Sequence, residues 1–88
     1  MSITKIIATE ENTPTTSGAA SNISTATCVR LFNNQNATVT VSISPSVGAG
    51  TTTTFSMPAG SVEFLAKLGS DVIWTSAAIK ANKVAFTN

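Results

Sequence analysis

The chain has 88 residues and a mass of 9.0 kDa, the size of one small domain, with no His, no Tyr and one Cys. The missing His excludes a Ser-His-Asp or Cys-His catalytic site and removes the commonest metal ligand, so we predict a protein that is not an enzyme and has no cofactor. With 5 basic and 4 acidic side chains and a net charge of +1, the chain lacks the basic surface of a nucleic-acid-binding protein, and no stretch is apolar enough to span a membrane, so neither is a predicted partner.

The N-terminal part of the chain divides into two segments. Residues 3–9 are β-prone, so residues 1–9 form either an N-terminal arm or the first strand. Residues 10–22 are rich in Thr, Ser, Ala, Gly and Pro, which predicts a loop or connector. The first ten residues lack the long apolar stretch of a secretory signal, so synthesis in the cytoplasm is expected.

We assign residues 23–88 to a β domain, and its first half predicts a hairpin. Residues 23–32 read as a strand with apolar residues in both phases. Residues 37–44 alternate strictly between apolar and hydroxyl side chains, which is typical of a half-buried antiparallel strand. The Asn-rich residues 33–36 between them read as a turn, so we expect residues 23–44 to form one hairpin.

The second half of the domain predicts four more strands. They cover residues 51–57, 61–68, 72–75 and 78–87, with turns at 45–50, 58–60 and 69–71 and a bend at 76–77. In the second of them, Val62, Phe64 and Ala66 are expected to point inward. The last strand changes phase, which predicts a bulge near Asn82, and a short helix over 76–83 is the alternative. Six or seven short strands in all indicate an all-β fold, a small antiparallel sandwich or barrel.

Several single residues have a structural and a functional interpretation. We place the side chains of Phe32, Phe55, Phe64 and Phe86 in the core. Cys28 is expected to be a buried free thiol, and a reactive or intermolecular thiol is the alternative. Trp74, the only Trp, is either a core or sheet-covering residue or a platform for a sugar or a protein partner.

Most of the chain carries a resemblance, and residues 10–22 and 45–54 are its least distinctive parts. The segment Phe55-Ser-Met-Pro-Ala-Gly-Ser-Val-Glu-Phe-Leu-Ala-Lys-Leu68, then Ser70 to Ile73 and Ala78 to Phe86, together with the opening Ile3 to Glu10, resembles small virion structural proteins of tailed bacteriophages that infect marine cyanobacteria. The resemblance implies a non-enzymatic part of the particle, and it supplies no catalytic residues.

The composition and the resemblance together predict a capsid decoration, or cement, protein of the virion surface. Because the chain has so few charges, its solubility depends on polar residues such as its 15 Thr and 11 Ser. Such a surface repels neighbouring molecules poorly, which favours a protein that functions while bound to another protein. The expected partner is the major capsid protein or another virion protein, with a copy of the chain itself as a further possibility. A tail, neck or fibre component and a carbohydrate-binding module are the alternative functions. The candidate assembly contacts are Ile3, Ile6, Ile7, Arg30 and Trp74.

Overall fold

The computed structural model describes residues 3–48 and 50–87, which form eight strands and one short 3-10 helix. The elements are β1 (Ile3–Ile6), β2 (Glu11–Asn12), η1 (Ser17–Ala19), β3 (Cys28–Phe32), β4 (Val39–Ser44), β5 (Thr53–Met57), β6 (Val62–Ala66), β7 (Val72–Thr75) and β8 (Lys80–Thr87). The predicted all-β antiparallel sandwich is confirmed. The eight described strands are one more than the larger of the two predicted numbers, seven, because the short β2 lies inside the segment that we expected to be a loop.

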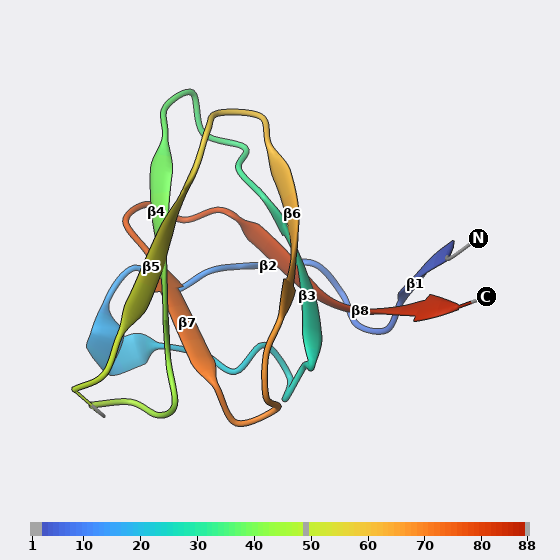
Figure 1. Ribbon diagram of the computed structural model, residues 1–88. Helices are drawn as coiled ribbons and strands as arrows, with labels where there is room; N and C mark the ends of the chain where they lie inside the picture. Colours follow the sequence, from blue (N-terminus) through green and yellow to red (C-terminus); the bar gives the residue numbers. More distant parts are fainter. Residues whose placement is uncertain (1–2, 49, 88) are drawn as a thin grey trace.

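The strands form two antiparallel sheets that pack face to face (Figure 1). The larger sheet has the order β1-β8-β3-β6, with β2 also paired to β8, and the smaller sheet has the order β5-β4-β7. Side chains from both sheets meet in one hydrophobic core. Its buried members are Ile23, Ala26, Val29, Leu31, Val39, Val41, Met57, Ile73, Ile79 and Ala81.

The predicted hairpin over residues 23–44 is wrong, because β3 and β4 belong to different sheets. β3 pairs with β6 and β8, whereas β4 pairs with β5 and β7. The residues between them form a crossover around the fully buried Asn33. Its side-chain Nδ2 donates to the carbonyl oxygens of Ala37, at 3.0 Å, and Met57, at 2.8 Å, while its Oδ1 accepts from the backbone N–H of Gln35. Asn33 thus replaces strand pairing where the chain changes sheets.

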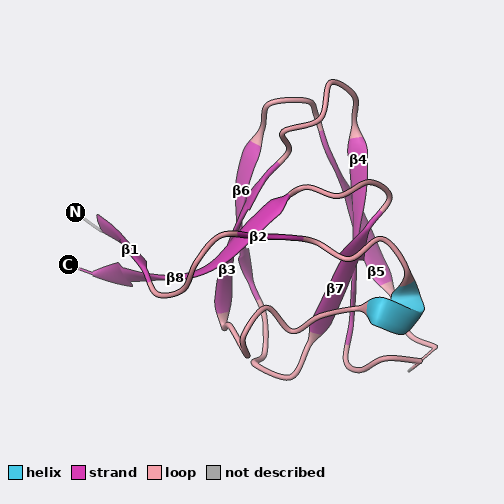
Figure 2. Cartoon of the chain, turned by 180° about the vertical axis from the view of Figure 1, so that it is seen from behind, coloured by secondary structure: helices cyan, strands magenta, loops and turns pink. Residues whose placement is uncertain are grey.

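The segment from residue 10 to 22 is also more ordered than predicted. After β2 pairs with β8, the backbone N–H of Thr13 donates to Ile79, the carbonyl of Pro14 accepts from Thr75, and Ser21 forms a bridge with Ile73. This segment therefore contacts β8 of one sheet and β7 of the other, and closes that side of the sandwich. The short helix η1 lies within it, beside the smaller sheet (Figure 2).

The predicted inward set of β6 is reversed. Val62 and Phe64 are 41% and 45% exposed, and Ala66 is exposed too, whereas Leu65 packs against the core. The reason is the register with β3, in which Leu65 lies opposite the buried Val29, so that residues 62, 64 and 66 face outward.

The predicted bulge and the alternative helix near Asn82 are both absent from the described strand β8. Its pairing runs without a break along β3 at residues 80–83 and along β1 at residues 84–87. Ala81, Asn82 and Val84 are all buried, so the change of apolar phase reflects a strand that is covered on both faces. The irregularity lies opposite, where the N–H groups of Ile7 and Ala8 both donate to the carbonyl oxygen of Lys83.

Candidate assembly surface

The face of the larger sheet that points away from the core carries apolar side chains. β3 and β6 supply three cross-strand pairs on this outer face, Cys28–Ala66, Arg30–Phe64 and Phe32–Val62. The half-buried Phe32 lies beside the exposed Val62 and Phe64, and the Arg30 guanidinium lies 5.9 Å from the centre of the Phe32 ring. We call this surface, made by Phe32, Val62 and Phe64 with Cys28 and Ala66, the outer face.

The polar groups around the outer face are satisfied mainly within the chain. Arg30 Nη1 lies 3.3 Å from Glu10 Oε2, and Lys80 Nζ donates to Asn12 Oδ1 at 2.7 Å. The predicted assembly residue Arg30 therefore already has an intramolecular partner, although an exposed ion pair of this kind contributes little stability. The buried Asn82 lies opposite Arg30, and its Oδ1 has no hydrogen-bond partner among the described residues.

Cys28 lies at one end of the outer face; it is a free thiol as predicted, but it is half-buried and not buried as we expected. Its position in β3 alternates with the buried Val29, which turns the sulfur away from the core. Desolvation still raises the pKa of the Cys28 thiol above its ordinary value of 9.0. The thiolate, which is the reactive form, is therefore disfavoured at neutral pH.

The terminal strands form a two-stranded ribbon that projects from the body of the sandwich (Figures 1 and 2). In this ribbon β1 pairs with residues 84–87 of β8, and Ile3 lies opposite Thr87. Ile6 is 58% exposed, and Ile7, just beyond β1, is 45% exposed. Three of the predicted assembly residues therefore belong to one projecting element, and residues 1–9 contain a paired strand rather than a free arm.

Trp74 lies on the opposite side of the sandwich from these features. It is half-buried on the outward side of the smaller sheet, where it pairs with Ser42. A cavity of about 310 Å³ adjoins it and is lined by Ser17, Ser44, Gly48, Gly50, Thr52 and Trp74. Trp74 is thus a sheet-covering residue, and the predicted contacts divide among the ribbon, the outer face and this cavity.

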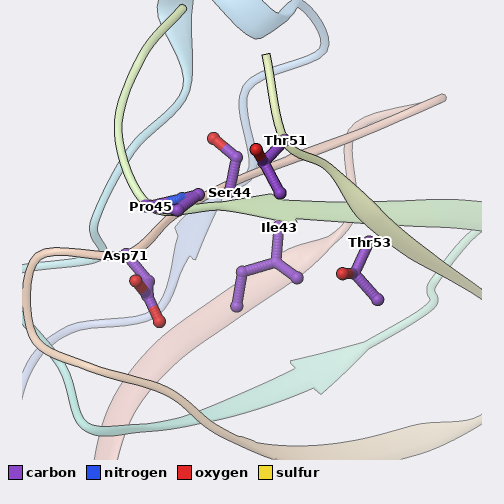
Figure 3. A pocket seen from close by; sticks show the side chains of 6 residues that line it. All are labelled: Ile43, Ser44, Pro45, Thr51, Thr53 and Asp71. Atoms are coloured by element: carbon purple, nitrogen blue, oxygen red, sulfur yellow. The ribbon is translucent and has the colours of Figure 1, made fainter. Parts of the chain in front are cut away.

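A second cavity, of about 200 Å³, opens beside the end of β4 (Figure 3). Asp71 lies on one side of it, and Thr51 and Thr53 lie on the other. The Asp71 carboxylate accepts the backbone N–H of Leu68, while the Asp71 carbonyl accepts from Lys67 Nζ at 2.9 Å. Burial lowers the pKa of Lys67, and the nearby Asp71 opposes that shift. The lining of this cavity therefore has one carboxylate, which caps a turn, and hydroxyl groups; it does not pair a general acid with a general base.

Two further classes of site are absent from the described part of the chain. It contains no group of three or more His, Cys, Asp or Glu side chains that would hold a metal ion. It also contains no helix that is both long enough and apolar enough to cross a bilayer.

The sequence patterns missed the outer face, since they placed Phe32 and Phe64 in the core. Phe55 does pack against the core, half-buried, and the side chain of Phe86 lies outside the described part of the structure. The apolar residues in both phases of residues 28–32 were the available indication of a second apolar face.

Comparison of the chain with known protein families, with curated proteins and with solved structures finds no match.

Proposed function

We propose that the protein is a non-enzymatic structural component of a phage virion, a decoration protein that docks on the outer surface of the capsid and stabilises it. The observation that carries the proposal is the outer face, where Phe32, Val62 and Phe64 form an apolar surface on a domain with few charges. Apolar surface that is exposed on a small domain is typical of an interaction site. The resemblance to virion proteins supplies the partner, the major capsid protein.

Docking also suits the energetics of a small sandwich. A domain of this size buries a limited core, so its stability is modest. A partner that binds only the folded state stabilises that state by mass action. A dense array of sites on a capsid would hold the domain folded, and the domain would in turn join neighbouring capsid subunits.

Occupancy of purified particles tests the proposal. Val62→Ser and Phe64→Ser remove apolar contacts from the outer face, and Val47→Ser is the matched control, because Val47 is 52% exposed in the loop after β4. Loss of about 1 kcal/mol of apolar burial corresponds to roughly fivefold weaker binding. Particles reconstituted with the Val62 and Phe64 variants should carry fewer copies than particles with wild type or the control. Equal occupancy for all variants, or no binding of wild type to capsids, would refute the proposal.

The position on the particle has one alternative, a tail, neck or fibre component. Copy number separates the two roles, because a decoration protein covers the whole shell whereas a tail component is present in few copies. Quantitative mass spectrometry of purified particles, referred to the major capsid protein, measures this ratio.

A carbohydrate-binding module is a second candidate function, favoured by the cavity at Trp74. An aromatic ring beside the hydroxyl groups of Ser17, Ser44 and Thr52 matches the apolar face and the hydroxyl groups of a sugar. Binding to a glycan array that Trp74→Ala abolishes would support this function. If the wild-type protein binds no glycan on the array, the carbohydrate-binding function is refuted.

A further inference from the structure

Both end strands of the larger sheet have a free edge. Within the described residues, β1 pairs only with β8 and β6 pairs only with β3. An edge strand presents unpaired N–H and C=O groups to any strand that can reach them. The β1 edge is the more accessible, because the ribbon projects from the body (Figure 1). A two-stranded ribbon is only marginally stable in water, and a third strand would stabilise it.

The two edge strands β1 and β6 carry opposite charges. Lys5 is the charged residue of β1 and Glu63 is the charged residue of β6, and both are exposed. Among the described residues the ion pair is Arg30–Glu10, so neither Lys5 nor Glu63 forms an ion pair with another described residue. An exposed apolar residue is next to each charge: Ile6 follows Lys5 in β1, and Val62 precedes Glu63 in β6.

The directions of the strands determine how one edge meets the other. Every pairing through β1, β8, β3 and β6 is antiparallel, so β1 and β6 run in opposite directions. A second copy that extends the sheet with the same face outward therefore places its β6 antiparallel to β1 of the first copy. This geometry is the more stable form of strand pairing.

The same pairings determine which side chains share a face. Lys5 lies opposite Ala85, and Glu63 connects through Leu31 to Ala81, so both charges lie on one face of the sheet. Ile6 and Val62 lie on the other face by the same count. When Lys5 is set opposite Glu63 in an antiparallel pair, Ile6 comes opposite Val62. A single register thus pairs the two opposite charges on one face and the two apolar side chains on the other.

We propose that copies of this chain associate head to tail, with β1 of one copy adding to β6 of the next and Lys5 paired with Glu63. The alternatives, β1 against β1 or β6 against β6, bring together strands of like charge. A head-to-tail contact repeats, and it yields a ring where the rotation closes and a filament where it does not. This inference does not depend on the virion role, because it concerns only contacts between copies of the chain.

Charge reversal with complementation tests the proposal in solution. Lys5→Glu and Glu63→Lys each place like charges opposite one another, and each should raise the dissociation constant of self-association about tenfold, as measured by sedimentation equilibrium. The double variant should restore association. An equimolar mixture of the two single variants should restore it as well, because each free edge then meets the opposite charge. Ser46→Glu and Ser46→Lys, in the exposed loop after β4, are charge-change controls.

The outcomes separate pairing of β1 with β6 from pairing of either strand with its own copy and from contacts that involve neither charge. Recovery in both the double variant and the mixture supports the proposal, provided that the Ser46 controls associate like wild type. A wild-type chain that stays monomeric at millimolar concentration overturns it. So does an assembly whose dissociation constant is unchanged by the single reversals, or one that the mixture fails to restore. Circular dichroism of each variant establishes that a loss of association does not reflect unfolding.

Discussion

Asn33 connects the two sheets, and its replacement by Ala should be among the most damaging single substitutions in the chain. The side chain is fully buried and makes three hydrogen bonds to backbone groups, those of Ala37, Met57 and Gln35. Its own backbone also bonds to Ser61 and Gly60 in the turn before β6. Truncation removes the side-chain bonds while the backbone groups stay in place, so they lose their partners.

The expected loss can be worked out from these bonds. Each neutral hydrogen bond contributes about 1 kcal/mol, and a buried group left without its partner costs about 1–3 kcal/mol. The Met57 carbonyl is the most buried of the three partners, so its cost is the largest. A total near 3 kcal/mol is a large part of the roughly 4–13 kcal/mol expected for a domain of this length. The melting temperature should fall by about 12–24 °C.

Chemical and thermal denaturation of Asn33→Ala, followed by circular dichroism, measure this loss. Asn34→Ala is the matched control, because Asn34 is the exposed neighbour in the same segment. The control should unfold within about 0.5 kcal/mol of wild type, as is usual for surface positions. If Asn33→Ala is as stable as Asn34→Ala, the crossover does not depend on this side chain and the reasoning is refuted.

Three further predictions concern other local features. Thr13→Val removes the acceptor of the Ile79 N–H, 3.0 Å away, and should cost about 1–3 kcal/mol in urea unfolding; an unchanged midpoint would contradict it. Ser24→Gly should raise the melting temperature by a few degrees, since Ser24 is exposed with φ of 59° and Gly relieves about 1 kcal/mol of strain there; a lower melting temperature would count against that strain. The Cys28 thiol should react slowly with a disulfide reagent until the protein unfolds. Because folding raises the pKa of this thiol, the thiol ionises more readily in the unfolded chain. The free energy of unfolding, relative to that of Cys28→Ser, should therefore be constant below pH 9.0 and fall as the pH rises beyond it. Equal pH profiles of unfolding for the two proteins would exclude this linkage.

Local patterns in the sequence located every described strand except β2, but they did not reveal how the strands pair. Val39 and Val41 alternate with hydroxyl residues, and both are buried as that pattern predicts. The pairing of the same strand depends on Asn33, which resembles any other turn-forming Asn in the sequence. Its role arises from the carbonyl of Met57, a residue distant along the chain, so no local pattern reveals it.

The candidate surface escaped prediction for a related reason. In β6, both Phe64 and Leu65 are apolar, and alternation alone favours the larger set at positions 62, 64 and 66. The register with β3 reverses that choice, because Leu65 meets the buried Val29 and Phe64 meets Arg30. A shift of one residue exchanges the two faces of a strand, so the surface was determined by pairing rather than by composition.

The small number of charged residues affects how the two edge strands β1 and β6 can pair. Natural sheets protect their edges with charged side chains, which hinder uncontrolled pairing. Here β1 carries Lys5 alone and β6 carries Glu63 alone. One charge on each of these two strands disfavours pairing of either strand with its own copy, and the opposite signs leave pairing of β1 with β6 open. More charges of both signs on these strands would hinder both kinds of pairing, and strands without charge would hinder neither, so one charge on each strand suits the proposed head-to-tail contact.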